Sequence, residues 1–117
     1  MTLTERQVGD VTVLALKGRL VLDAGDEVLR QRVRALVNAG RLKILLDLRD
    51  VTYIDSCGIG VLVEKFVSVR SRGGDMRLVH LTARSRHLMA ITRLLTVFPI
   101  FDTEADALAS FASEPSA

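Results

Sequence analysis

The stretch DLRDVTYIDSCGIGVLVEKFVSVRSRGG, residues 47–74, decides the fold of this chain. It continues the apolar run KILLDL at residues 43–48, which has the length and composition of a buried strand. The hexapeptide DSCGIG at residues 55–60 then turns the chain. Apolar residues recur at helical spacing from there to about Arg72, and Gly73-Gly74 supplies the stop. The stretch therefore predicts a strand, a tight polar turn and a helix, in that order.

The start of this helix is the place where we expect function. The first turn of a helix leaves backbone N–H groups without partners, and the positive end of the helix dipole faces the same spot. The apolar positions that would hold the helix against a core are Ile59, Leu62 or Val63, Phe66 and Val69. The amino-terminal end is thus expected to be fixed in place and open to a partner.

The composition of the chain limits the classes of protein to which it can belong. The chain has 117 residues, 49% of them hydrophobic, which suits one compact domain. A net charge of +2, with dispersed basic residues and only Tyr53 as an aromatic near the turn, argues against a nucleic-acid partner. No apolar run is long enough to insert in a membrane, and the first residues do not resemble a signal peptide. A single cysteine excludes a disulfide framework and a cysteine-based metal site. We expect a cytoplasmic single domain over residues 1–112, with a flexible tail at 113–117.

The rest of the chain alternates strands and helices. Gly9-Asp10 reads as a hairpin turn, and residues 18–25 as a loop whose apolar part packs down. Helix signals include Asp26 and Glu27 in a first turn and Ser85 as an N-cap. The apolar stripe of the first helix is predicted at Val28 or Leu29, Val33, Leu36 and Val37, and that of the helix after Ser85 at Leu88, Ile91 and Leu95. Right-handed crossovers then make the strands from Lys43 onward largely parallel in an α/β fold. The ranges predicted are strands at 3–8, 11–17, 43–48, 76–81 and 97–101, and helices at 26–38, from the turn at 55–60 to about Arg72, at 85–95 and at 104–112.

Three interpretations of the central turn stay open on the residues alone. In the first, the turn has only a structural role: Asp55 or Ser56 caps the helix, and Gly58 and Gly60 allow backbone segments to approach closely. In the second, the helix end binds a phosphate or another anion. The chain has neither GxxxxGK[ST] nor GxGxxG, which argues against a nucleotide there. In the third, the turn is a regulated protein surface whose hydroxyl accepts a phosphoryl group.

Catalytic and metal-binding patterns are weak, and we therefore predict a protein that is not an enzyme and uses no cofactor or metal. Neither His80, within a predicted strand, nor His87 pairs in sequence with Cys57. Asp47, Asp50 and Asp55 could gather around a hard cation at the strand ends. Solvated loop carboxylates are the more frequent outcome of such a pattern.

Taken together, the residues resemble the STAS domain family, and within it the stand-alone bacterial anti-sigma factor antagonists. The resemblance is strongest in ILLDLRDVTYIDSCGIGVL at residues 44–62, which follows the family's strand, D-[ST]-[ST]-G-[LI]-G turn and helix. Further matches are VLALKGRL at 13–20, RGGD at 72–75 and the segment 94–101. The resemblance implies a mixed, mostly parallel sheet of four to five strands with about four helices.

The same resemblance implies action by binding in a partner-switching system of transcription regulation. Such proteins capture an anti-sigma factor, usually a serine kinase of the histidine-kinase-like ATPase fold, and thereby free a sigma factor. The kinase counters this by phosphorylating the second hydroxyl residue of the turn. That position is Cys57 in this chain, and Ser56 stands one residue before it. The exchange predicts an antagonist whose off-switch is missing, or a STAS module that serves another partner.

The predicted partner-binding surface combines the turn with the exposed side of the helix and the loop after Gly18. Its residues are Asp23, Asp55, Ser56, Cys57, Gly58, Ile59, Val61, Glu64 and Lys65. Rival functions are an accessory subunit of a lipid-transport ABC system and a sensor of a small ligand or nucleotide. For Cys57, the alternatives are a small residue that fills the turn and a redox-active thiol favoured by the helix end but opposed by Asp55.

Overall fold

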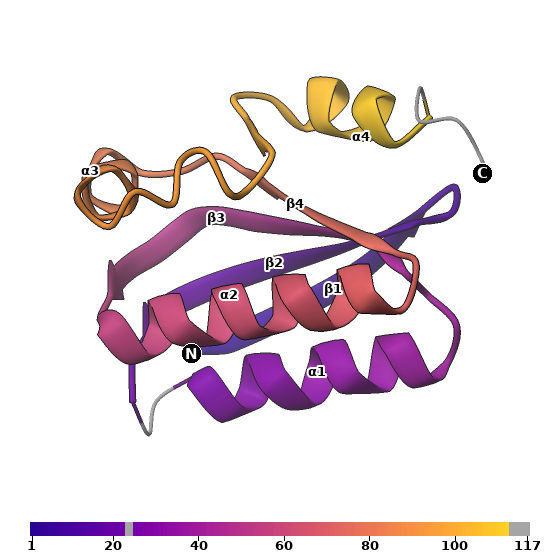
Figure 1. Cartoon of the computed structure of the whole chain (residues 1–117), viewed down its shortest axis with the longest axis horizontal. Coiled ribbons are helices and arrows are strands. Elements are labelled where there is room, and N and C mark those ends of the chain that lie inside the picture. Colours follow the sequence, from indigo (N-terminus) through magenta and orange to yellow (C-terminus); the bar gives the residue numbers. More distant parts are fainter. Residues whose placement is uncertain (23–24, 113–117) are drawn as a thin grey trace.

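The computed structural model describes residues 1–22 and 25–112 and shows five strands and four helices over them (Figure 1). The tail predicted at 113–117 lies outside the described residues. The elements in chain order are β1 (Thr2–Val8), β2 (Val11–Leu20), α1 (Asp26–Asn38), β3 (Lys43–Ile54), α2 (Ser56–Ser71), β4 (Asp75–Val79), α3 (Ala83–Ile91), β5 (Ile100–Phe101) and α4 (Glu104–Ala112).

The strands form one sheet in the order β1-β2-β3-β4-β5. The β1–β2 hairpin is antiparallel, and every later pair is parallel, because a helical segment carries the chain back between successive strands. The predicted mixed, mostly parallel α/β sheet is confirmed. Helices α1 and α2 lie side by side on one face, and α4 covers the other face (Figure 1).

Alternating side chains of the central strands fill two cores, one on each face of the sheet. Leu14 and Leu46 point into the larger core with the apolar faces of α1 and α2. Val13 and Leu45 point the opposite way, where Phe111 of α4 packs on them. The stripe predicted for α1 is also confirmed, with Leu29 rather than Val28 as its first buried residue. Its other buried residues are Val33, Leu36 and Val37.

Both central strands extend beyond their predicted ends. β2 does not close at Gly18 but continues to Leu20, and β3 continues to Ile54 instead of Leu48. The two extensions pair with each other, with register shifts around Lys17 and Gly18, so each stabilises the other. Sequence reasoning missed this because a pairing between distant segments leaves no local signal. The prediction that part of the following loop packs down is confirmed, since Val21 is buried.

The carboxyl-terminal half departs from prediction at three places. Strand β4 ends at Val79, so His80 lies after it, half-buried and with a positive φ of 59°. Thr82, not Ser85, caps α3: its Oγ1 accepts a hydrogen bond from the Ser85 N–H at 3.1 Å. The helix then ends at Ile91, which is exposed rather than in the apolar stripe. The predicted edge strand is shortened to β5 by Pro99, which has no N–H to donate.

Helix α2 begins where its backbone meets the end of β2. A methyl group at Gly58 would overlap the backbone oxygen of Leu20 and would lie 2.9 Å from Cγ2 of Ile54. Gly60 has open space instead, with nothing within 4 Å of an added methyl group. The prediction that both glycines allow a close approach is therefore right for Gly58 and wrong for Gly60.

The two glycines give a matched pair of substitutions. We expect Gly58→Ala to lower the free energy of unfolding by at least about 1–3 kcal/mol, because the backbone of β2 or α2 must move to admit the methyl group. We expect Gly60→Ala to raise it by about 0.5–1 kcal/mol, because alanine is the better residue inside an exposed helix. Urea denaturation of both variants measures the two changes. If both substitutions changed the free energy of unfolding in the same direction, the close contact at Gly58 would be contradicted.

Candidate functional site

One carboxylate joins the start of α2 to the exit of β2. Asp55 is the N-cap of α2, with extended backbone (φ −100°, ψ −175°), and its Oδ1 accepts a hydrogen bond from the Gly58 N–H at 2.8 Å. Its Oδ2 accepts a second hydrogen bond from the Leu22 N–H at 3.2 Å. The Asp55 N–H in turn donates to the Leu20 backbone oxygen at 3.4 Å. Of the two predicted caps, Asp55 is the one used, and it also holds Leu22, which follows β2, against the start of the helix.

The surroundings of this carboxylate keep it charged. The N–H of Gly58 lowers the pKa of the Asp55 carboxyl from its usual value of 3.8, the slight burial opposes this, and the N–H groups of Leu22 and Cys57 contribute further lowering. The positive end of the α2 dipole acts in the same direction. Asp55 therefore places a negative charge at the helix end at neutral pH.

The predicted site residues differ in their exposure. Ser56 and Glu64 are exposed, and Asp55 and Cys57 are partly exposed. Gly58 and Ile59 are buried, so they position the turn rather than offer side chains to a partner. Asp23 lies outside the described residues. Ser56 and Cys57 thus form the accessible tip of the turn.

Two residues that were predicted to be exposed are buried. Val61 is only 3% exposed and Lys65 only 8%. The cause is that α2 packs on the sheet and on α1 at once, which widens its buried face beyond a single stripe. The Lys65 stem is covered while its Nζ lies 3.7 Å from Oε2 of Glu64, an arrangement common for long basic side chains.

Glu64 belongs to a charged bridge between α1 and α2. Nε of Arg30 lies 2.9 Å from Oε2 of Glu64, and Nη1 of the same guanidinium lies 2.9 Å from Oε2 of Glu27. The guanidinium lowers the pKa of the Glu64 carboxyl, with Lys65 adding to the effect. The bridge joins α1 to α2 beside the turn. Exposed ion pairs of this kind contribute little to stability.

Leu22 is the residue of this region that sequence reasoning missed. Its side chain is 58% exposed, although its N–H is bound to Asp55. A leucine in a short polar connection is a sequence signal for such a surface residue, but only the structure shows that it lies beside the turn. The end of α2 therefore combines an apolar side chain with a negative charge and a small polar tip.

The described part of the chain gives little support to the catalytic and metal-binding roles that were considered from the sequence. His80 contacts Asp47 (Nδ1 to Oδ1, 3.1 Å) and Arg49 (Nε2 to Nη2, 2.9 Å), two neighbours on β3. Over residues 1–22 and 25–112 there is no cluster of three or more histidine, cysteine or acidic residues suited to a metal ion. Asp47, Asp50 and Asp55, which the sequence allowed to gather around a cation, form no such group among these residues. None of the helices in these ranges is both long and apolar enough to cross a membrane.

Comparison with known proteins identifies the family. The chain belongs to the STAS domain family, whose sequence pattern matches residues 3–107. An anti-sigma F factor antagonist of Paenibacillus polymyxa is 28% identical over 98 residues, which span 84% of each chain. A Thermotoga neapolitana homologue of the protein TM1081 is 36% identical over 101 residues, or 86% of this chain and 89% of the relative.

Solved structures agree with this assignment. The NMR structure of TM1081, a protein of Thermotoga maritima, matches with a TM-score of 0.82 and 27% sequence identity, and the match covers 97% of this chain and 91% of that chain. The STAS resemblance drawn from the motif at residues 44–62 is confirmed, as is the fold that it implies.

The cap can be tested by its response to acid. Because the pKa of Asp55 is lower in the folded than in the unfolded chain, its two hydrogen bonds stabilise the fold above the unfolded pKa and are lost as the pH falls through the folded one. We expect the amide resonances of Gly58 and Leu22 to titrate together, with a midpoint below 3.8. Two-dimensional NMR between neutral and acidic pH measures this.

Asp55→Asn is the matched control, because an amide oxygen still caps the helix but does not titrate. In that variant both amide resonances should stay constant over the same range. Separate midpoints for Gly58 and Leu22 in the unsubstituted protein, or a common midpoint above 3.8, would contradict the shared carboxylate.

Proposed function

We propose that this protein is an anti-sigma factor antagonist that acts in the cytoplasm by binding an anti-sigma factor of the histidine-kinase-like ATPase fold. The observation that carries the proposal is the open end of α2, where the STAS motif places Asp55, Ser56 and Cys57 at one accessible turn. The names of the relatives support it, since one of them, matched over 84% of its length, is an anti-sigma F factor antagonist. No bond is made or broken in such a function, which agrees with the sequence's lack of a catalytic pattern.

The surface proposed for the partner is centred on Ser56 and Cys57. Leu22 adds an exposed apolar side chain on one side, and Asp55 and Glu64 add negative charges. Asp23 is kept in the proposed surface because it directly follows Leu22 in the sequence. A partner that fits would present an apolar pocket rimmed by basic groups, and a contact of ordinary size buries roughly 800 Å² on each side.

Cys57 is the distinctive residue of the proposed site. In the family the corresponding hydroxyl accepts a phosphoryl group from the anti-sigma factor, and this phosphate would bring about 1.5–2 negative charges close to Asp55. A thiol has nearly the same size as a hydroxyl but is not a substrate for a serine kinase. The protein therefore keeps the unmodified surface and stays competent to bind, unless Ser56 serves as a substitute acceptor.

This leads to a test with the cognate anti-sigma kinase and ATP. We expect the unsubstituted protein to bind the kinase and to remain free of phosphate by mass spectrometry. We expect Cys57→Ser to take up one phosphate and then to lose at least about tenfold in affinity, because the added charge repels the partner surface.

Ser56→Ala provides the control, since it removes the remaining hydroxyl of the turn. It should stay free of phosphate, as the unsubstituted protein does, and its affinity for the kinase gives the share of binding that the Ser56 hydroxyl contributes. Stoichiometric phosphate on Ser56 of the unsubstituted protein would refute the missing switch, while the binding role would survive. Failure of every form to bind an anti-sigma factor would refute the binding role itself.

A further inference from the structure

Helix α4 rests on a row of side chains that crosses four strands, on the face of the sheet opposite α1 and α2 (Figure 1). The strand register makes each member of the row the direct partner of the next: Arg6 of β1, Val13 of β2, Leu45 of β3 and Arg77 of β4. Directly paired residues point to the same face of a sheet. We call this row the α4 seat; it has an apolar middle and a basic residue at each end.

The side of α4 that faces the seat has the complementary pattern. Glu104, at the start of the helix, forms an ion pair with Arg6. Near the other end the Phe111 ring covers Arg77, whose guanidinium carbon lies 4.2 Å from the ring centre. Two apolar residues stand between them at helical spacing and pack on the smaller core: Ala107 and Leu108. The seat therefore accepts a helix in which an acidic residue is followed by apolar residues three, four and seven positions later.

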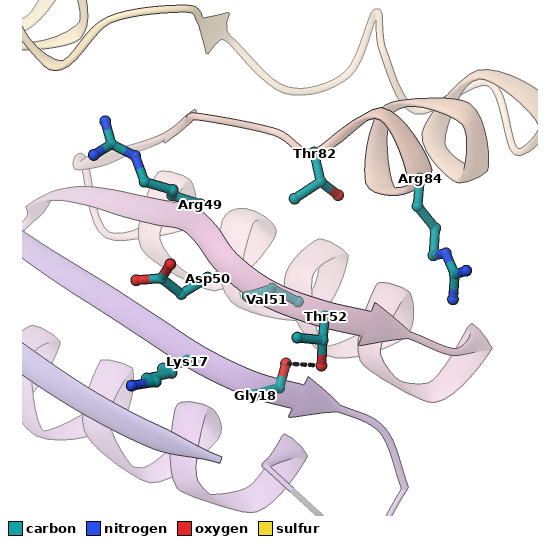
Figure 2. A pocket seen from close by; sticks show the side chains of 8 residues that line it. All are labelled: Lys17, Gly18, Arg49, Asp50, Val51, Thr52, Thr82 and Arg84. Atoms are coloured by element: carbon teal, nitrogen blue, oxygen red, sulfur yellow. Dashed lines mark hydrogen bonds between the residues drawn. The ribbon is translucent and has the colours of Figure 1, made fainter.

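The rest of the fold is held together without α4. Among residues 1–22 and 25–112, the helix contributes buried side chains to the smaller core only, and the larger core contains none of its residues. The ends of β2 and β3 are joined to each other, since Thr52 Oγ1 donates a hydrogen bond to the Gly18 backbone oxygen at 3.2 Å (Figure 2). The departure of α4 would thus leave the larger core and the pairing of these strands in place.

Arg77 lowers the free energy needed to lift α4 from the sheet. Arg77 is only 4% exposed, and its Nη1 lies 2.9 Å from Oδ2 of Asp75. A buried ion pair gives up the hydration of both charges, so it holds a covering helix less firmly than apolar residues of the same size do. When α4 leaves, Arg77 regains water, which offsets part of the cost of exposing the apolar middle of the seat. The pair between Arg6 and Glu104 lies at the surface, where ion pairs contribute little.

The attachment of α4 to the chain allows it to move as a unit. Two exposed residues, Asp102 and Thr103, link it to β5. Thr103 Oγ1 accepts a hydrogen bond from the Asp106 N–H at 3.2 Å and so caps the start of the helix. Both partners of this bond belong to the helix or its linker, and the cap therefore moves with α4.

We propose that α4 opens as a unit and docks on the α4 seat of a second copy of this chain, so that two copies exchange their α4 helices. The helix that matches the seat in charge and apolar pattern is α4 itself, and a second copy offers the same helix and the same seat. Exchange then forms the contacts of the single chain again between two chains, which is a low-cost route to a dimer. The proposal goes beyond the proposed function and uses none of its partner-binding residues.

The opening step is tested by native-state hydrogen exchange of the full chain, followed by NMR. We expect the amides of α4 to exchange together and at least about tenfold faster than those of β2 and β3, because α4 opens without global unfolding. Equal protection of α4 and the central strands would overturn the proposal.

The exchange step is tested by a charge swap between two differently tagged full-length variants, Arg6→Glu and Glu104→Arg. Each variant sets two like charges against each other within one chain, whereas an exchanged pair of the two brings opposite charges together on both seats. We expect mixed dimers to outnumber either like dimer at least about fivefold at high protein concentration and low salt. Tag capture and size-exclusion chromatography with light scattering measure them, and thermal unfolding verifies that each variant is folded.

The double variant Arg6→Glu/Glu104→Arg is the matched control, because it restores the ion pair within one chain. Mixed with the unsubstituted protein, it should form fewer mixed dimers than like dimers, since exchange between them would pair like charges on both seats. Exclusively monomeric chains at every concentration, or equal numbers of mixed and like dimers in both mixtures, would overturn the exchange of α4.

Discussion

The close approach of Gly58 to the backbone of Leu20 is the constraint on which the rest of the site depends. It places the first turn of α2 directly against the end of β2, at a distance that no side chain would allow. The Asp55 carboxylate then bonds both segments, through Gly58 on the helix and Leu22 on the connection. The turn, the start of the helix and Leu22 are therefore positioned as one unit, which leaves Ser56 and Cys57 accessible at a fixed place.

The paired ends of β2 and β3 hold the start of α2 in place. Leu20 at the end of β2 meets the first turn of α2, and Gly18, two residues earlier on the same strand, accepts a hydrogen bond from the Thr52 hydroxyl of β3. The extension of β2 past Gly18 brings Leu20 to this point, because it keeps the strand paired with β3 up to Ile54. The irregular end of β2 thus positions the proposed protein contact.

Patterns among neighbouring residues predicted the fold well. They failed at features that depend on contacts between segments distant in the sequence. The stripe of α1 and the strand–turn–helix order around Asp55 follow from periodicity and capping, which are properties of neighbouring residues. The burial of Val61 and Lys65 depends on α1 packing against α2, which periodicity within α2 cannot reveal. The extensions of β2 and β3 were missed for the same reason, because the two segments that pair are distant in the sequence.

The most direct measurement is NMR mapping of the protein as an anti-sigma factor kinase is titrated in. Our interpretation predicts that the perturbed amides cluster at Leu22, at Ser56 to Gly60 and near Glu64, where the cap and the close contact expose the helix end. Perturbations centred on α4 or on β1, with the amides of Ser56 and Cys57 unchanged, would show that partners bind elsewhere. That result would contradict the role assigned to the amino-terminal end of α2.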